Sequence, residues 1–467
     1  MQKKRDLIII GGGLGGYVSA IRAAQLKKRV LLIEEDKIGG TCMNYGCIPT
    51  KYLLHQTKIL KELKDNKNLD GPRAEIRCDW KVVQEQKTKI IERLVRGVEF
   101  ILHRNGIETL QGEAFLKGER QVSVKIQGVF KNFEAERIIL ATGSQPVELP
   151  FLKPNNHEII TSREALELES IPKKLIIVGA GAIGIEMGTI YQRLGTEVTI
   201  LEIMPTILPG SDQEIVARLE RILLKQGLKI YTQMKIEDTR VREGKVALKG
   251  TCLKTQSSFE FEGEKVLLSA GRKPNLNFLK VENLPFTFDK GGFMKVNSRL
   301  ETCIPGIFAV GDLIGGKLLA PKASNEGAVA AENAAGAMKE MDYRALPLAV
   351  FTEPEFASVG LTEQEAKERE LKIQVGHFPL QACGRALIMD SVEGMVKVIA
   401  NDRDEILGAQ ILAPNASEII PELTLALNKK MKLQDISSSV HIHPTISESV
   451  GEAALKAKNM AIHILNI

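Results

Sequence analysis

Two cysteines separated by four residues are the strongest sign of chemistry in this chain. Cys42 and Cys47 precede an apolar-periodic segment that predicts a helix over residues 51 to about 63. On a regular helix, positions five apart point about 140° away from each other, so the two sulfurs can bond only where the turn is irregular. Gly46 permits such a distortion and Asn44 tolerates it. The spacing therefore predicts a dithiol that can open and close.

The composition limits the classes of protein that could contain such a dithiol. The 467 residues suggest roughly two to four domains, and 44% hydrophobic and 26% charged residues are typical of a soluble globular protein. Six cysteines are too few for a secreted disulfide framework in so long a chain, so a disulfide here is expected to be catalytic, in a reducing compartment. The net charge of +5 is small, and the basic residues at positions 3 to 5 predict a solvated N-terminus and no nucleic-acid partner.

The sequence predicts no membrane contact. Residues 1–16 resemble a signal peptide at first, but the apolar run at 7–10 is short and breaks into glycines. No stretch approaches the roughly 18 apolar residues that a membrane span needs. We therefore expect a cytoplasmic protein.

Residues 6–34 form a first dinucleotide-binding motif, with a buried strand, a glycine turn, a helix and a second strand in order. Gly11 would make the tight turn, Gly13 would let the backbone approach a pyrophosphate, and Gly16 would let the helix pack on the strand. Glu34 ends the second strand and would accept a hydrogen bond from a ribose hydroxyl. The complete unit is far more specific than the glycines alone.

The same pattern recurs over residues 174–202. Gly179, Gly181 and Gly184 make the turn, and Glu202 closes the following strand. A carboxylate at this position suits a free ribose 2′-hydroxyl and repels a 2′-phosphate, and no arginine follows it closely. Two motifs imply two dinucleotides, and the second is predicted to be NAD rather than NADP.

Two dinucleotides and a dithiol indicate a relay from nicotinamide through flavin to sulfur. The sequence here resembles the FAD-dependent pyridine nucleotide-disulfide reductases, and within them the dihydrolipoamide dehydrogenases are the closest match. The resemblance covers nearly the whole chain. The matching segments are the redox signature at 39–51, the exit from the flavin domain at 141–144, the return at 271–275, the second flavin motif at 306–312 and the C-terminal catalytic motif at 441–448.

The resemblance implies an α/β fold with two Rossmann-like dinucleotide-binding domains, for FAD and NAD, and a C-terminal α+β dimerisation domain. The FAD-binding domain would comprise residues 1–147 and 271–345, the NAD-binding domain residues 148–270, and the dimerisation domain residues 346–467. Prolines near residues 146–154 and at 347 support these breaks independently. Alternating residues over 237–248 predict hairpin strands beside the NAD fold.

The resemblance also implies roles at the reaction centre. Cys47 would lie nearest the flavin, and Cys42 would exchange with substrate. A helix N-terminus alone would lower a thiol pKa by less than about one unit, so a base is needed as well. His443 would be that base and Glu448 would orient it, with His441 as the competing candidate.

The remaining site residues also follow from the resemblance. Lys51 would pair with Glu186 near the reactive end of the flavin, although Glu186 could instead be an ordinary acid at a helix start. The residues assigned to FAD are Gly11, Gly13, Gly16, Glu34, Lys51, Thr142, Gly143, Ser144, Gly311, Asp312 and Ala320. Those assigned to NAD are Gly179, Gly181, Gly184, Glu186, Glu202 and Gly271.

Three hypotheses remain open. The first is a dihydrolipoamide dehydrogenase: an obligate homodimer with an active site shared between chains, acting on lipoyl domains of 2-oxo acid dehydrogenase or glycine cleavage proteins. The second is a related reductase that uses NADH on another disulfide, since Pro321 stands where many lipoamide dehydrogenases have histidine. The third is a low-turnover flavoprotein that serves as a redox sensor or binding subunit. The other four cysteines show no metal-binding pattern, and no metal is expected.

Overall fold

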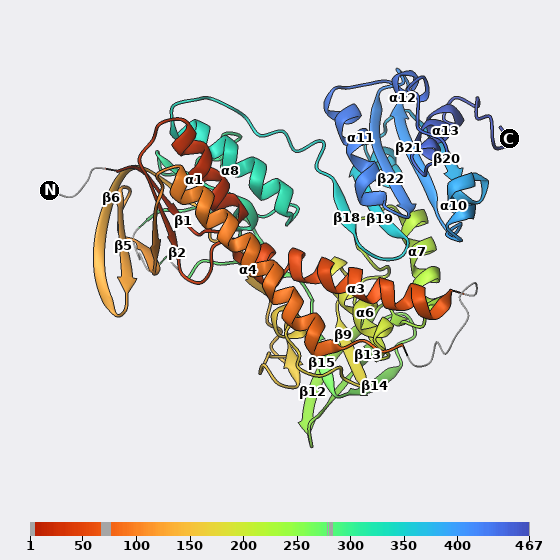
Figure 1. The fold of residues 1–467 in the computed structure, drawn as a ribbon, viewed down its shortest axis with the longest axis horizontal. Helices are drawn as coiled ribbons and strands as arrows, with labels where there is room; N and C mark the ends of the chain where they lie inside the picture. The colour runs from red at the N-terminus through yellow and green to blue at the C-terminus, as the bar shows by residue number, and fades with distance from the viewer. Residues whose placement is uncertain (1–4, 67–75, 278, 280–283, 467) are drawn as a thin grey trace.

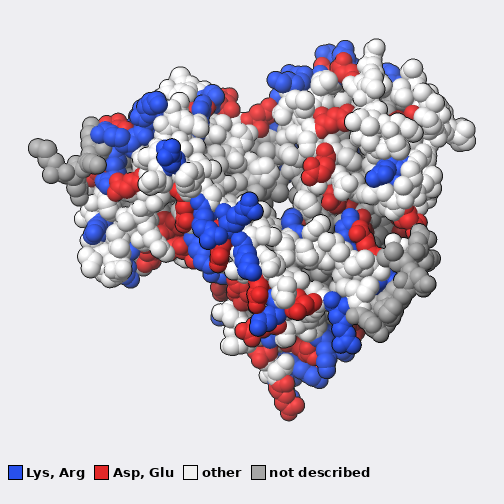
Figure 2. Space-filling model, viewed as in Figure 1, with Lys and Arg blue, Asp and Glu red and all other residues white. Residues whose placement is uncertain are grey.

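The computed structural model of this chain describes residues 5–66, 76–277, 279 and 284–466. Figure 1 shows three sheet-containing parts, with the N-terminal part and the C-terminal part side by side and the middle of the chain below them. Positions 3 and 4 of the basic N-terminal cluster lie outside the described residues. Arg5 pairs with Glu108 at 2.9 Å, and Figure 2 shows acidic and basic side chains interspersed over the visible face.

The first sheet has seven strands in the order β3-β2-β1-β6-β5-β4, with β17 beside β6. The parallel neighbours β2, β1, β6 and β17 bury continuous apolar runs, as strands covered on both faces do. Strand β17 comes from far along the chain, so residues on both sides of the middle part share one sheet. The strands are β1 (Arg5–Ile10), β2 (Val30–Glu34), β3 (Glu108–Gln111), β4 (Glu113–Leu116), β5 (Gln121–Ile126), β6 (Val129–Leu140) and β17 (Ile307–Ala309).

Helices α1 and α8 pack closely against each other beside this sheet. The Ser19 hydroxyl donates to the carbonyl of Gly327 at 3.0 Å, and a Cβ added at Gly327 would lie 2.4 Å from the carbonyl oxygen of Gly15. Glycine is therefore required where the two helices meet. The elements of this part are α1 (Leu14–Gln25), α2 (Gly40–Tyr45), α3 (Cys47–Asp65), α4 (Trp80–Arg104), η2 (Gly311–Ile314) and α8 (Ala320–Ala334).

The second sheet is parallel, in the order β11-β10-β9-β15-β8. The predicted hairpin over 237–248 is confirmed, because β12 and β13 pair antiparallel, and β14 extends them to three strands. This part contains β8 (Ile159–Ile160), α5 (Ser162–Ala165), β9 (Lys174–Val178), α6 (Ala182–Arg193), β10 (Glu197–Leu201), α7 (Gln213–Lys225), β11 (Lys229–Tyr231), β12 (Met234–Arg242), β13 (Lys245–Cys252), β14 (Ser258–Gly263) and β15 (Lys265–Leu268).

The third sheet is antiparallel, in the order β18-β19-β22-β21-β20. A short pair, β7 (Ser144–Pro146) with β16 (Arg272–Pro274), joins the exit from the first part to the return. The C-terminal elements are β18 (Leu348–Val350), β19 (Glu355–Gly360), α9 (Glu363–Glu368), β20 (Ile373–Pro379), η3 (Leu380–Ala382), α10 (Gly384–Ile388), β21 (Met395–Asn401), β22 (Ile406–Ala413), α11 (Ala416–Asn428), α12 (Leu433–Ser437) and α13 (Glu448–Lys456).

The second and third sheets share an apolar core. Tyr191 of α6, Phe356 of β19 and Leu412 of β22 are fully buried members of one cluster. The predicted fold class is confirmed, with one nucleotide-type sheet that has a parallel centre, a second that is fully parallel, and a C-terminal α+β part. The helix expected from residue 51 begins four residues earlier, at Cys47, and the long helix α4 was not predicted. None of the helices that the structure describes has the length and apolar character needed to cross a membrane.

Candidate active site

The dithiol lies at a break between two helices. Cys42 is in α2 and Cys47 begins α3, and Gly46 between them has φ −145° and ψ −109°, outside helical values. The predicted irregular turn is therefore confirmed, and glycine allows it. Both cysteines are free thiols, and hydrogen bonding between them is the largest influence on the pKa of each.

This hydrogen bond makes the two sulfurs unequal. The hydrogen bond from the Cys42 thiol and the nearby Lys51 cation together outweigh burial and lower the pKa of Cys47 to about 7. The same bond and burial raise the pKa of Cys42. Near pH 7 about half of Cys47 is therefore a thiolate while Cys42 remains a thiol, and the thiolate is the reactive form.

The predicted pair of Lys51 and Glu186 is present. The Lys51 ammonium donates to both carboxylate oxygens of Glu186, at 2.7 and 3.0 Å. Glu186 is 4% exposed, and it also accepts the backbone N–H of Phe351 at 3.0 Å. The Lys51 ammonium lies 4.6 Å from the centre of the Phe351 ring, within range of a cation–π interaction. Three parts of the fold thus meet one turn after Cys47.

A cavity of about 820 Å³ joins the dithiol to the first glycine turn. Its volume is within the range of ligand pockets. Its lining residues come from all three parts of the chain, whose positions are shown in Figure 1. Predicted site residues that line it are Gly11, Gly13, Glu34, Cys42, Cys47, Lys51, Thr142, Gly143, Ser144, Glu186, Gly311, Asp312 and Ala320.

The glycine-turn end of this cavity has the features of a dinucleotide cradle. Glu34 accepts the backbone N–H groups of Gly12 and Asp36, and burial raises the pKa of its carboxyl. A Cβ added at Gly16 would lie 1.7 Å from the Gly11 carbonyl oxygen, so helix–strand packing requires glycine there, as predicted. Beside Gly13 the nearest atom to an added Cβ is 3.9 Å away, which leaves room for a phosphate at the start of α1. These residues fit FAD.

The second glycine turn repeats the arrangement. Glu202 is 6% exposed and accepts the N–H groups of Ala180 and Met204, at 2.6 and 2.8 Å. A Cβ added at Gly181 would meet nothing within 4 Å, whereas one at Gly184 would lie 2.0 Å from the Gly179 carbonyl oxygen. The open space at Gly181 and the start of α6 fit a second dinucleotide.

Glu186 and Gly271 are not part of the turn itself. The sequence predicted both a catalytic and an NAD-binding role for Glu186. In the structure it lies on α6, lines the large cavity and pairs with Lys51. Gly271, with φ +117°, follows shortly after Ser269, whose carbonyl oxygen lies against Gly179.

The two C-terminal histidines have different surroundings. His443 bonds through Nδ1 to Glu448 at 2.8 Å, and its side chain is 80% exposed. Burial raises the pKa of Glu448, but the Thr445 N–H and the His443 ring lower it more, so the net shift is downward. His441 bonds to Glu422 at 3.0 Å and is largely buried. Among the described residues that line the dithiol cavity neither histidine is present, so one chain does not bring His443 to Cys42.

Sequence reasoning did not assign a role to Arg272. Its guanidinium donates to the Ser144 hydroxyl and carbonyl, both at 2.7 Å, and lies 3.9 Å from Asp312. The Ser144 hydroxyl in turn donates to Asp312 at 2.5 Å. Arg272 therefore fixes the two predicted FAD residues beside the cavity. The sequence could have pointed to Arg272 because it lies within the 271–275 motif.

Proline at position 321 is explained by helix geometry. Pro321 lies in the first turn of α8 and lines the cavity, next to Ala320. Backbone N–H groups in a first turn have no partner within the helix, so proline is tolerated there.

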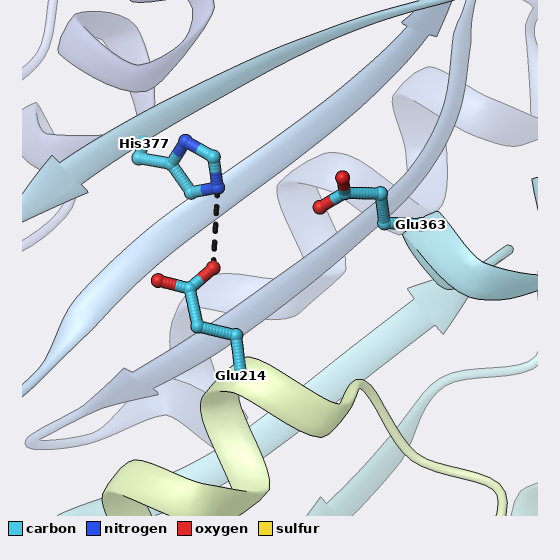
Figure 3. Close-up of side chains that lie close together, drawn as sticks. All are labelled: Glu214, Glu363 and His377. Atoms are coloured by element: carbon cyan, nitrogen blue, oxygen red, sulfur yellow. Dashed lines mark ion pairs between the residues drawn. The ribbon is translucent and has the colours of Figure 1, made fainter.

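One group of described residues has the donor types of a metal site. Glu214, Glu363 and His377 each place a ligand atom within 4.8 Å of the others (Figure 3). However, the buried Lys397 ammonium lies 3.0 Å from Glu214 and 3.2 Å from Glu363. The ammonium already supplies the positive charge that these carboxylates need, so we interpret the group as an ion-pair network.

Comparison with protein families decides the wider relationship. The family model "pyridine nucleotide-disulphide oxidoreductase" matches residues 5–327, and the dimerisation-domain model of that family matches residues 346–454. The chain belongs to this family. The family uses FAD and a nicotinamide dinucleotide, so the chain is a flavoprotein oxidoreductase with a dimerisation domain.

Individual relatives agree along the full length. A dihydrolipoyl dehydrogenase of Thermus scotoductus is 41% identical, covering 99% of this chain and 100% of the relative. The mitochondrial dihydrolipoyl dehydrogenase of Pisum sativum is 39% identical, covering 99% of this chain and 93% of its own.

Two solved structures are also similar. LpdA from Mycobacterium tuberculosis superposes with a TM-score of 0.88 at 25% identity, covering 96% of this chain and 99% of its own. The HOCl-induced flavoprotein disulfide reductase RclA from Escherichia coli, as its Cu(II) complex, superposes with a TM-score of 0.86 at 27% identity, covering 97% and 99%.

Proposed function

We propose that this oxidoreductase is a dihydrolipoamide dehydrogenase that reduces NAD⁺. The observation that carries the proposal is the dithiol itself: a hydrogen-bonded Cys42–Cys47 pair in the cavity that begins at the first glycine turn and ends at the Lys51–Glu186 pair. The similarity of the whole chain to dihydrolipoyl dehydrogenases supports lipoamide as the substrate.

The proposed reaction starts from the oxidised Cys42–Cys47 disulfide. A dihydrolipoyl thiolate attacks the sulfur of Cys42, which forms a mixed disulfide and releases the Cys47 thiolate. The second dihydrolipoyl thiol then displaces Cys42, so that lipoamide leaves oxidised and the protein holds a dithiol. FAD held at the first glycine turn would supply the redox chemistry that takes the electron pair from the Cys42–Cys47 dithiol to NAD⁺. The lowered pKa of Cys47 makes it the better leaving group in the first step.

A base must remove the protons of the two substrate thiols. His443 is exposed and held through Nδ1 by Glu448, so its Nε2 is free to accept a proton from an arriving thiol. We infer that it acts on the Cys42–Cys47 pair of a second copy in a homodimer. Large apolar side chains around it are exposed in the single chain, with Val440 at 99% and Ile442 at 79%, which supports burial against a partner.

The nucleotide and partner assignments follow from the same reaction. Glu202 favours NAD⁺ because its carboxylate would repel a 2′-phosphate. Lipoyl domains of 2-oxo acid dehydrogenase or glycine cleavage proteins would present the dihydrolipoyl thiols. A cytoplasmic location, where thiols stay reduced, remains a prediction.

A second function is favoured by one specific observation. Pro321 lines the cavity beside the dithiol, and the similar structure RclA is a disulfide reductase of another kind. The alternative is a reductase in which NADH is consumed and a different disulfide is reduced at Cys42.

Steady-state assays in both directions separate the two functions. We expect flavin-loaded protein to reduce NAD⁺ rapidly with dihydrolipoamide and to reduce NADP⁺ poorly. Failure to turn over dihydrolipoamide, together with rapid NADH oxidation by another disulfide, would replace the proposal with the alternative.

Complementation tests the shared site. Subunits carrying Cys47→Ala and subunits carrying His443→Ala are each expected to be inactive as homodimers. A heterodimer of the two retains one complete site, so purified heterodimers should recover up to about half of the activity of the unaltered protein. Inactive heterodimers would exclude a site shared between chains.

A further inference from the structure

A buried lysine of the C-terminal sheet reaches into the second nucleotide-binding part. Lys397 lies on β21, and its side chain is 1% exposed. Its ammonium contacts Asp212 at 2.9 Å, Glu214 at 3.0 Å and Glu363 at 3.2 Å. The ammonium donates to both carboxylate oxygens of Asp212, forms an ion pair with Glu214 and donates to Glu363. The first two precede or begin α7, and the third begins α9.

Asp212 depends on this lysine more than the other two acids do. Glu214 also contacts Arg218 at 3.4 Å, and Glu363 also contacts Lys367 at 2.7 Å. Among the described residues, Lys397 is the one cation paired with Asp212, whose side chain is 3% exposed. Loss of Lys397 would therefore leave Asp212 as an uncompensated buried charge, which is the costly way to break an ion pair.

Asp212 ends a segment that lies on the second glycine turn. Its carboxylate caps α7 by accepting the N–H of Ile215 at 3.2 Å. Residues 203–211 lead to it from Glu202, and the N–H of Leu208 donates to the carbonyl of Ala180 at 2.9 Å. Near the start of this segment, the N–H of Met204 donates to the Glu202 carboxylate. The segment therefore borders both the glycine turn and the Glu202 carboxylate.

Leu208 shows that the segment is held in place from outside. It has φ +44°, in the left-handed region that leucine rarely adopts. Such a conformation persists only where the surrounding structure fixes it. The Ala180 bond fixes it on one side, and the Asp212–Lys397 pair fixes the end of the segment four residues later.

We propose that Lys397 is a positioning residue for the second nucleotide site and acts through Asp212. It holds residues 203–211 against the glycine turn, and so keeps Ala180 and Glu202 in the geometry that binds the adenosine half of the nicotinamide dinucleotide. The inference rests on the proposed binding of that nucleotide at the second turn. In this proposal, the C-terminal sheet supports the nucleotide site through Lys397, although the lysine does not touch the nucleotide. Figure 3 shows the neighbouring side chains Glu214, Glu363 and His377 at the junction of α7, α9 and β20.

Binding of ADP-ribose to the flavin-loaded protein tests this directly. ADP-ribose lacks the nicotinamide, so calorimetry measures binding without any reaction and independently of the thiol substrate. We expect Lys397→Met to raise the dissociation constant about tenfold, which corresponds to roughly 1.4 kcal/mol. Asp212→Asn is expected to raise it in the same way, because asparagine still caps the helix but no longer forms an ion pair with Lys397.

A matched control lies at the other end of α7. Lys225 pairs with Glu393 at 2.5 Å and joins the same two parts of the fold, but both side chains are about half exposed or more. Lys225→Met should leave ADP-ribose binding unchanged, whereas Lys397→Arg should restore much of the binding lost in Lys397→Met.

Each outcome decides the inference. Unchanged ADP-ribose binding in both Lys397→Met and Asp212→Asn, even with lowered thermal stability, would show that the lysine is merely structural. If Lys397→Met does not fold, Asp212→Asn alone carries the test, since Lys397 then keeps two carboxylate partners. Absence of ADP-ribose binding to the unaltered protein would refute the nucleotide assignment and the inference with it. If the protein instead does not turn over dihydrolipoamide, the ADP-ribose test stays valid, because ADP-ribose binding does not involve the thiol substrate.

Discussion

Replacement of Cys42 by alanine should raise the pKa of Cys47. The largest influence on Cys47 is the hydrogen bond from the Cys42 thiol, which lowers its pKa from 9.0 to about 7 together with the Lys51 cation. A shift of two units corresponds to about 2.7 kcal/mol. Because Lys51 remains in the variant, we expect a rise of at least about one unit rather than the full two, so the midpoint moves to roughly 8 or above.

The direction of the pKa shift of Cys47 determines what the assay should show. A lowered pKa means that Cys47 is a thiolate above about pH 7, so its alkylation by iodoacetamide should rise with pH around that value. With Cys42→Ala the rise should occur at higher pH, and alkylation at pH 7 should be at least about fivefold slower, the fall in thiolate fraction for a one-unit rise in the pKa. Peptide mapping distinguishes Cys47 from the other thiols. Cys42→Ser is the matched control, because its hydroxyl still donates, and it should keep the midpoint near that of the unaltered protein. An identical midpoint for the alanine and serine variants would refute the reasoning, since the cause would then be Lys51 or the helix start.

Two further predictions concern the charged side chains of the site. Lys51→Met leaves the Glu186 carboxylate buried without its cation; breaking a fully buried pair costs roughly 3–5 kcal/mol, and we expect less here because the Lys51 side chain is 32% exposed. Urea unfolding with bound flavin should show the loss, and an unchanged midpoint would mean that the pair does not stabilise the fold. Glu202→Ala should reduce the preference for NAD⁺ over NADP⁺ by about tenfold or more, the size of one charge-dependent contact. The ratio of kcat/KM for the two nucleotides measures it, and an unaltered ratio would mean that Glu202 does not select the nucleotide.

Local patterns in the sequence were enough to predict much of the fold. Each glycine motif lies within one strand–turn–helix unit, so residues such as Gly16 and Gly184 could be placed by spacing alone. The structure then shows why no larger residue fits there, because an added Cβ would overlap a carbonyl oxygen. The break at Gly46 could be predicted for the same reason, since Cys42 and Cys47 are close in sequence.

Contacts between distant segments could not be predicted in this way. Lys397 and Asp212 are 185 positions apart, and neither belongs to a recognisable motif. Arg272 meets Ser144 across 128 positions, through a two-stranded pair that has no clear pattern in the sequence. Lys51 and Glu186 are 135 positions apart in the sequence. Their pairing could be proposed from the family resemblance but not from periodicity. In each case, two independent segments must fold before the charges meet.

A single-turnover experiment tests the central claim most directly. One equivalent of dihydrolipoamide per subunit is added anaerobically to the flavin-loaded, oxidised protein, and NAD⁺ is added afterwards. If electrons pass through the Cys42–Cys47 pair, about one NADH per subunit should appear with the unaltered protein, and none with Cys42→Ala or Cys47→Ala. NADH formed in full amount by either variant would contradict the account, because the electrons would then bypass the dithiol.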